Sequence, residues 1–361
     1  MTSTEIEQRG VSVAEVDALG VDLDIRVAAA TPAEVRAQIV DAWRDCIPAS
    51  SERPGRRTID LPASMFDDVE LGLSDLSTRV TLEALDALRG TRLLLHAAGI
   101  ATDDGRVLAL VGPSGRGKTT ASRHLGARFA YVSDETVAVA DDLAVTAYRK
   151  PLSIITEGHA HKQQVAPSEL GLRPLPHAPL HLMGLTLIER VPDADDIGPV
   201  RVDTIDAICE MTPQISYLPE LPTPLQYLAR LFDAVGAPTR LVYRDAVELP
   251  ALVEAMFDSA GAPAQPWAPV PPPVVGGPWR AVEVDDAILV DGRACILREG
   301  VVTALDHRGR LTWMQARRGA STEQIAHAAV AEFGAPVEGS ALELIAATLD
   351  DLLAHGLIEA A

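Results

Sequence analysis

The sequence is poor in cysteine and in positive charge. Its three cysteines, Cys46, Cys209 and Cys295, lie far apart and form no C-x-x-C pair. They predict reduced thiols in a cytoplasmic protein and no cysteine-based metal site. The 31 lysine and arginine residues stand against 51 aspartate and glutamate residues, which gives a formal net charge of −20. Nucleic acid and anionic membranes would repel such a chain, so we expect neither as a partner.

Long apolar runs and targeting signals are also lacking. No uninterrupted apolar stretch reaches the length of a membrane span, and the N-terminal MTSTEIEQRG has no charged-then-apolar signal pattern. No internal repeat is present at a fixed period. With a hydrophobic fraction of 47%, the chain can still form packed cores, and we expect an intracellular protein with more than one domain.

One short stretch carries a clear chemical signal. Residues 112–120 read GPSGRGKTT and follow the apolar run VLALV, residues 107–111. The run favours a buried strand, and helix-compatible residues come after the loop. Backbone N–H groups in such a loop bind phosphate oxygens, Lys118 reaches the β- and γ-phosphates, and the Thr119 hydroxyl ligates magnesium. An ordinary glycine turn before a helix is the alternative. The predicted nucleotide-binding residues are Gly112, Ser114, Gly115, Arg116, Gly117, Lys118, Thr119 and Thr120, with ATP and Mg²⁺ as cofactors.

Two further features add candidate catalytic residues. Asp134 and Glu135 follow Ser133 at the end of an apolar stretch. Adjacent strand residues point to opposite faces, so one acid could face a transferred phosphoryl group while the other reaches magnesium or a backbone amide. A turn that contains two acids is the alternative. His96, in the apolar segment RLLLHAAGI, is either a hydrogen-bonded core residue or part of the site.

The order of these features resembles the HPr serine kinase family and related kinases that modify ribosomally made peptides. His96 precedes GPSGRGKTT, and Asp134 follows Lys118 by about sixteen residues. The resemblance implies an α/β fold of the phosphoenolpyruvate-carboxykinase-like type, with a mixed sheet around the P-loop. It implies that Asp134 is the general base for a hydroxyl, that Glu135 assists the metal, and that His96 and Lys118 complete the catalytic site.

The sequence departs from that family at two points. Glu135 stands where the family has aspartate, and the glycine-rich signature segment of true HPr kinases is missing after the acid pair. Activity on HPr itself is therefore not expected. Nucleotide binding without catalytic activity is the alternative.

A proline-rich stretch, APAQPWAPVPPPVVGGP, divides the chain at residues 262–278. Its prolines exclude a helix and favour an extended spacer. Strands that crowd before and after the P-loop helix indicate a mixed sheet rather than a regular βαβ alternation. Whether the first 88 residues form a separate layer or a lobe of the nucleotide domain stays open. The predicted parts are an N-terminal α/β lobe (1–88), a P-loop domain (89–261), a linker (262–279) and a C-terminal domain (280–361).

The C-terminal domain has the pattern of a small antiparallel sheet followed by helices. Period-two strands are broken by Asp291-Gly292 and by Arg-Glu-Gly at 298–300. Capping-box patterns predict the starts of capped helices. They are Thr31/Glu34 near the N-terminus, and Ser321/Gln324 and Ser340/Glu343 in this domain. We expect residues 280–361 to fold alone.

This domain also resembles the winged-helix-like PqqD family, which recognises precursor peptides, through WMQARRGASTEQIAHAAVAEFG and DDLLAHGLIEAA. In that family a leader peptide adds a strand beside the third strand and packs against the last helix. A DNA-binding winged helix is disfavoured because the helices are acidic or apolar. Two functions follow: a kinase for a peptide held by its own C-terminal domain, or a scaffold that presents the peptide to other tailoring enzymes. The implied peptide-binding residues are Val301, Val302, Thr303, Leu305, Leu349 and Leu353.

Overall fold

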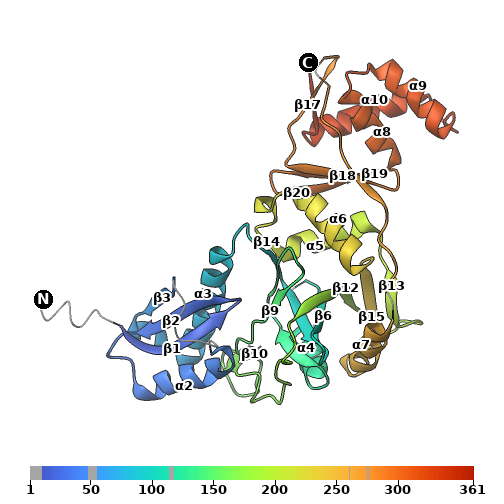
Figure 1. Cartoon of the computed structure of the whole chain (residues 1–361). Coiled ribbons are helices and arrows are strands. Elements are labelled where there is room, and N and C mark those ends of the chain that lie inside the picture. The colour runs from blue at the N-terminus through green and yellow to red at the C-terminus, as the bar shows by residue number, and fades with distance from the viewer. Residues whose placement is uncertain (1–9, 48–54, 114–117, 260, 275) are drawn as a thin grey trace, which may run out of the picture. The chain divides into compact units, whose positions relative to one another are not determined.

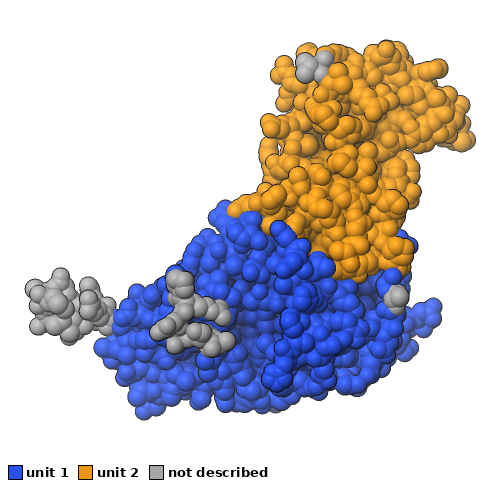
Figure 2. Space-filling model, in the orientation of Figure 1, with its two compact units in different colours: residues 1–201, 213–217, 239–261 blue, residues 202–212, 218–238, 262–361 orange. Residues whose placement is uncertain are grey.

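The computed structural model describes residues 10–47, 55–113, 118–259, 261–274 and 276–361. The chain forms two compact units that interleave along the sequence (Figure 2). The four-part division expected from the sequence stays a prediction. Unit 1 contains residues 1–201, 213–217 and 239–261, and unit 2 contains residues 202–212, 218–238 and 262–361.

Unit 1 is a mixed α/β assembly (Figure 1). Its strands are β1 (Val11–Ala18), β2 (Val21–Val27), β3 (Arg57–Leu61), β4 (Leu93–Leu95), β5 (Ala97–Ala101), β6 (Arg106–Val111), β7 (Ala130–Ser133), β8 (Val137–Val139), β9 (Val145–Thr146), β10 (Leu152–Ile154), β11 (Gln163–Val165), β12 (His181–Arg190), β13 (Gly198–Arg201), β14 (Ile215–Ser216) and β15 (Thr239–Tyr243). Its helices are α2 (Ala33–Trp43), α3 (Val69–Ala87), α4 (Lys118–Gly126) and α7 (Leu249–Asp258).

The largest sheet of unit 1 has the strand order β13-β15-β12-β6-β5-β7. β12 runs parallel to β6 and β15, whereas β5 is antiparallel to β6 and β7. The prediction of a mixed sheet is therefore confirmed. β6 lies inside this sheet and is buried from Val107 to Val111, because α4 and α7 pack into the same apolar core as Leu108 and Leu110. The burial on both sides explains why the sequence of β6 is continuously apolar.

The described residues among the first 88 pack against the rest of unit 1. The sheet β1-β2-β3 and helices α2 and α3 share one apolar core with Leu94 of β4 and Ala138 of β8. Those two strands belong to a further sheet, β14-β4-β8-β9. Because one core is continuous across these elements, this region is not an independently packed layer.

The start of α2 differs from its prediction. The helix is confirmed, but it begins at Ala33 with Pro32 at the N-cap position, and no side chain caps it. The predicted capping box of Thr31 and Glu34 is wrong, because that box would place the cap at Thr31. A proline directly before the first turn sets the entry of the chain instead.

Unit 2 contains an antiparallel sheet and helices from two parts of the sequence. Its elements are α5 (Thr204–Met211), α6 (Pro224–Val235), β16 (Trp267–Pro269), β17 (Trp279–Ala281), β18 (Asp286–Val290), β19 (Arg293–Arg298), β20 (Val301–Leu305), α8 (His307–Ala316), α9 (Thr322–Phe333), α10 (Ala341–Ala354) and β21 (Ile358–Ala360). The sheet order is β16-β18-β19-β20, and β17 pairs with β21. Part of the predicted linker, β16, is thus a strand of this sheet.

Two tight turns set the register of this sheet. Asp291 and Gly292 join β18 to β19, and Glu299 and Gly300 join β19 to β20. All four residues have φ between 45° and 79°, which the favoured two-residue hairpin turns require. The breaks predicted at these positions are confirmed.

The helices that follow the sheet begin where the capping patterns place them. Ser321 with Gln324 forms a capping box at α9, and Ser340 with Glu343 forms one at α10. α8, α9 and α10 share a core with Ile296 of β19. The antiparallel sheet and the two capped helices are therefore present as predicted, whereas the winged-helix assignment stays a prediction.

The opposite face of this sheet is covered by α5 and α6. Ala294 and Ile296 of β19 belong to the core with α8–α10, while the alternating Cys295 and Leu297 are equally buried. Alternate strand residues point to opposite faces, so a second layer must cover Cys295 and Leu297. α5 and α6 contact β19 and form this layer.

Polar contacts join this layer to the sheet. The backbone N–H of Gln226 in α6 donates to the buried Asp286 at 2.9 Å, and its side-chain amide donates at 2.7 Å. Arg293 of β19 forms ion pairs with Asp203 and Asp206 of the α5 region. In the described part of the chain, no helix is both long and apolar enough to cross a membrane.

Candidate functional site

The P-loop candidate lies between β6 and α4 in unit 1. β6 ends at Val111 and α4 begins at Lys118, which confirms the strand and the helix on either side of the loop. Gly112 lies so close to β12 that a Cβ atom would come within 2.9 Å of Ile188 Cγ1, so a larger residue would require the Ile188 side chain to move. Ser114, Gly115, Arg116 and Gly117 lie outside the described residues.

Lys118 is buried at the start of α4. Its Nζ donates a hydrogen bond of 2.5 Å to the carbonyl oxygen of Gly112. Burial lowers the pKa of Lys118, and the carboxylates of Glu135 and Asp134 partly oppose that effect. The Lys118 side chain thus lines the same cavity as the two candidate acids.

Asp134 lies directly after β7 and contacts the P-loop helix. Its Oδ1 accepts a hydrogen bond of 2.8 Å from the Tyr131 hydroxyl, and its Oδ2 is 3.4 Å from the Thr119 hydroxyl, which donates to it. Burial raises the pKa of Asp134, while Lys150 and the Tyr131 hydrogen bond act in the opposite direction. A raised pKa keeps this carboxylate more basic than an exposed aspartate.

Glu135 is held by two cationic or hydrogen-bonding side chains. His96 Nδ1 is 3.3 Å from its Oε1, and Lys150 Nζ is 3.5 Å from its Oε2. Burial alone would raise the pKa of Glu135, but the His96 hydrogen bond and the Lys150 charge outweigh it and lower the pKa to about 2. Glu135 is therefore an ionised carboxylate with both oxygens engaged.

The two acids do not point to opposite faces as a strand would place them. β7 ends at Ser133, whose hydroxyl accepts hydrogen bonds from the backbone N–H groups of Glu135 and Thr136. This turn changes the direction of the backbone, and Asp134 and Glu135 line the same cavity. The expectation drawn from strand alternation is wrong, because the acids follow the strand instead of lying in it.

His96 lies where the chain leaves one sheet and enters another. β4 before it belongs to the sheet β14-β4-β8-β9, and β5 after it belongs to the sheet that contains β6. Its Nδ1 is 2.8 Å from the carbonyl oxygen of Glu135. A carbonyl only accepts, so Nδ1 carries the hydrogen. His96 is hydrogen-bonded, as the core interpretation requires, and it also lines the cavity.

These residues line one cavity of about 470 Å³. Half of the lining residues are not among those predicted from the sequence, and four of them, at positions 150 and 153–155, stand in the segment RKPLSII. The signal in the sequence is the pair of adjacent cations Arg149 and Lys150 just before the short strand β10. The lining residues are His96, Lys118, Thr119, Thr120, Arg123, Asp134, Glu135, Lys150, Ser153, Ile154, Ile155 and Lys162.

The donor set suits magnesium better than a metal held by protein alone. Among the described residues, no group of three or more histidine, cysteine or acidic side chains could hold a metal ion. Mg²⁺ is usually bound by one or two carboxylates together with water and substrate phosphates. The Thr119 hydroxyl beside the Asp134 carboxylate, with Glu135 next in the chain, fits that pattern.

The predicted peptide-binding residues lie in unit 2. In the described part of the chain, β20 pairs with β19 and has no strand on its other side, and Val301 is 63% exposed. Leu349 of α10 is only 1% exposed and lies in the core, so it does not face a surface groove. Leu353 is half-buried and remains accessible. Peptide binding itself stays a prediction.

Comparisons with known proteins do not place the chain in a family. No family model matches it, and no curated protein matches it. Among solved structures, it is similar to the HPr(Ser) kinase/phosphatase from Coxiella burnetii, with 14% sequence identity and a TM-score of 0.28. The match covers 46% of this chain and 93% of that chain. A likeness this weak does not define the fold or the activity.

Proposed function

We propose that this protein binds ATP with Mg²⁺ and transfers the γ-phosphoryl group to a hydroxyl group. The observation that carries the proposal is the contact between Thr119 and Asp134 beside Lys118. It brings a P-loop helix start and a buried carboxylate into one cavity. Phosphoryl transfer depends mainly on such positioning and on charge stabilisation.

The two acids suit different roles. The acceptor hydroxyl must lose a proton, and a base works best when its pKa is closer to the operating pH. The raised pKa of Asp134 favours it as that base, whereas Glu135, with a pKa of about 2, favours a fixed negative charge. Environments that separate two carboxyl pKa values in this way are typical of acid–base sites.

Magnesium and the P-loop lysine would complete the site. Thr119 and Glu135 would hold Mg²⁺ together with phosphate oxygens, and the ion would neutralise charge on the phosphates. Lys118 would leave the carbonyl of Gly112 and contact the β- and γ-phosphates. His96 holds Glu135 in place through its Nδ1.

We further propose that the acceptor is a ribosomally made precursor peptide whose leader binds at β20. An edge strand offers backbone hydrogen bonds to an extended peptide, and half-exposed side chains give it register. Binding of the leader would raise the effective concentration of the acceptor at the transfer site. The second candidate is a scaffold for other tailoring enzymes, favoured by the glutamate at position 135.

The test is calorimetric titration of the full chain with Mg²⁺–ATP. We expect binding by the wild type and a loss of affinity of roughly hundredfold or more in Lys118→Ala, because a buried charge contact to phosphate is removed. Arg79→Ala, at an exposed position of α3 outside this cavity, is the matched control and should keep the affinity. Absence of binding by the wild type would refute the nucleotide assignment.

Phosphoryl transfer is measured separately with peptides encoded beside this gene. Transfer of labelled phosphate to a hydroxyl of such a peptide supports the kinase. Nucleotide binding with no transfer to any peptide that the protein binds would favour the scaffold instead.

A further inference from the structure

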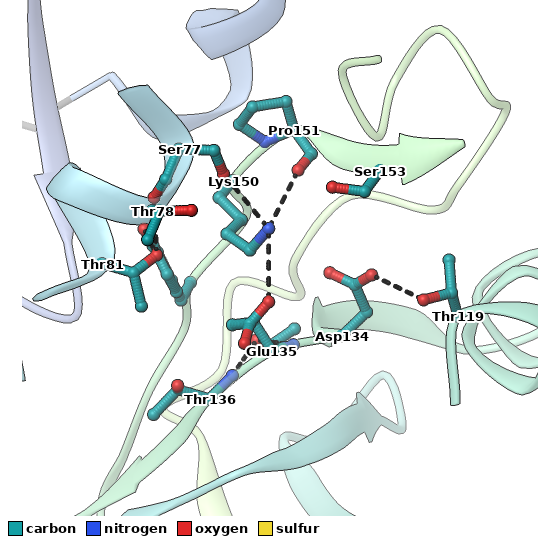
Figure 3. A network of polar contacts seen from close by, with 12 residues as sticks. Ser77, Thr78, Thr81, Thr119, Asp134, Glu135, Thr136, Lys150, Pro151 and Ser153 are labelled. Carbon is teal, nitrogen blue, oxygen red and sulfur yellow. Dashed lines mark hydrogen bonds and ion pairs between the residues drawn. The ribbon is translucent and has the colours of Figure 1, made fainter. Parts of the chain in front are cut away.

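Lys150 is a buried cation that the sequence analysis did not assign. Its side chain is only 4% exposed. Burial of an ammonium group is costly unless charged and polar partners surround it. Its Nζ is 3.5 Å from Glu135 Oε2, 3.3 Å from Ser77 Oγ and 3.2 Å from the carbonyl oxygen of Pro151 (Figure 3).

The partner Ser77 comes from α3, in the first 88 residues. Thr81, one helical turn further along α3, hydrogen-bonds the Tyr148 hydroxyl at 2.8 Å. Residues four apart lie on the same face of a helix. α3 therefore holds the segment that carries Lys150 at two buried points, Tyr148 and Lys150 itself.

Lys150 and His96 hold the two oxygens of one carboxylate. His96 contacts Oε1 of Glu135 and Lys150 contacts Oε2. Because the two contacts lie on different oxygens, rotation of the carboxylate would break at least one of them. Loss of Lys150 would leave Oε2 without its cation and free the carboxylate to turn about the His96 contact.

We infer that Lys150 is a positioning residue that fixes the Glu135 carboxylate beside the P-loop, and that Ser77 of α3 fixes Lys150 in turn. This inference rests on the proposed function, because it assigns Glu135 a part in holding magnesium and nucleotide. It also gives the N-terminal region a role: α3 sets the orientation of the second acid. Lys150 acts through Glu135 and is not itself a catalytic residue.

The test measures ATP affinity of the full chain with Mg²⁺ and, in parallel, with EDTA. Lys150→Met keeps the length of the side chain and removes its charge. Loss of a residue that orients a metal-assisting group typically costs about 10–100-fold. We expect a loss of that size with Mg²⁺ and little change with EDTA, and we expect Lys150→Arg to recover part of it.

Ser77→Ala removes one hydroxyl without burying an unpaired charge, so it tests the inference even if Lys150→Met does not fold. It should weaken Mg²⁺–ATP binding in the same direction, by a smaller factor. Thr78→Ala is the matched control, because Thr78 is the next residue of α3, is exposed and bonds only within the helix, to the Ser74 carbonyl. It should have no effect.

Equal losses with Mg²⁺ and with EDTA would overturn the inference, because Lys150 would then contact phosphate directly. Unchanged Mg²⁺–ATP affinity in Ser77→Ala and Lys150→Met would overturn it as well. If the wild type binds no ATP, the proposed function fails, and crystal structures of the wild type and Lys150→Met decide the positioning role. An unmoved Glu135 carboxylate in the variant would refute that role.

Discussion

The cavity in unit 1 and the β20 edge in unit 2 differ in what would hold a ligand. The cavity contains paired charges, such as the half-buried Glu135 with the buried Lys150. The edge offers backbone groups and half-exposed apolar side chains. Charged groups at fixed distances leave a motif in the sequence, whereas an edge exists only because no strand joins it. We therefore expect the two sites to respond to different substitutions and conditions.

The largest effect is expected from removing α5 and α6, which cover one face of the sheet that contains β20. Residues 280–361 alone lack α5 and α6, so the face that carries Cys295 and Leu297 would be exposed. We expect this fragment to aggregate or to bind a hydrophobic dye without a cooperative unfolding transition. The sequence pattern of residues 280–361 predicts independent folding, but it contains no sign of the layer that α5 and α6 form.

A longer fragment is the control for that experiment. Residues 202–361, with residues 239–261 replaced by a short Gly/Ser linker, include α5, α6 and all of unit 2 without β15 and α7 of unit 1. We expect a cooperative thermal transition in circular dichroism for this fragment. Cooperative folding of residues 280–361 would show that the edge does not depend on the helices.

The second prediction concerns a substitution that changes only the charged cavity of unit 1. Asp134→Asn should retain ATP binding but lose phosphoryl transfer by roughly two to four orders of magnitude, because the base that accepts the proton is removed. Leader-peptide binding in unit 2 should not change. Tyr131→Phe, which removes only the hydrogen bond to Asp134, should cost much less. Wild-type transfer rates in Asp134→Asn would exclude Asp134 from the mechanism.

The third prediction concerns substitutions that disrupt only the β20 edge. Adjacent residues of β20 point their N–H groups in opposite directions, so one of Val302 and Thr303 donates toward β19 and the other toward the free side. Proline at the outward position should weaken binding of a labelled leader peptide by about tenfold, which is the loss of one backbone hydrogen bond. Proline at the inward position should lower the melting temperature instead.

If both proline variants lowered the melting temperature and neither changed peptide binding, β20 would not be the peptide-binding edge. Mg²⁺–ATP affinity is the internal control, because both substitutions lie in unit 2 and the P-loop cavity lies in unit 1. A change in that affinity would show that the effects are not confined to the edge.

The smallest effect concerns pH. The pKa of Glu135 is about 2 in the folded protein against an ordinary 4.5, so its contribution to stability is present above pH 4.5 and is lost as pH falls toward 2. Glu135→Gln should cost about 1 kcal/mol of unfolding free energy at pH 7, a value reduced for partial exposure. Urea denaturation should show the difference shrinking between pH 4.5 and pH 3. A constant difference would contradict the cause given for this pKa.

The sequence predicts the local elements well where the chemistry is local. The strand before the P-loop and the turns at Asp291-Gly292 and Glu299-Gly300 depend on neighbouring residues, and all are confirmed. Two capping boxes are confirmed for the same reason. The third predicted capping box, at Thr31, is wrong because Pro32 occupies the N-cap position of α2 instead.

The sequence does not predict contacts between distant residues. Lys150 becomes part of the site only because Ser77, 73 positions earlier, and Glu135 meet it in space. In the same way, Leu349 fits an apolar stripe, but packing of α8–α10 decides which side of that stripe is buried. The periodicity of apolar residues predicts which residues share one face of a helix, but it does not predict which elements pack against that face.

The interleaving of the two units has a consequence for synthesis. β15, which pairs with β12 in the P-loop sheet, follows α5 and α6 in the chain, while β18–β20, which those helices cover, follow β15. On the ribosome, α5 and α6 therefore emerge before any of the strands that bury their apolar faces. A nascent chain in that state exposes apolar surface until its last hundred residues are made, and this interval is when a chaperone would be needed.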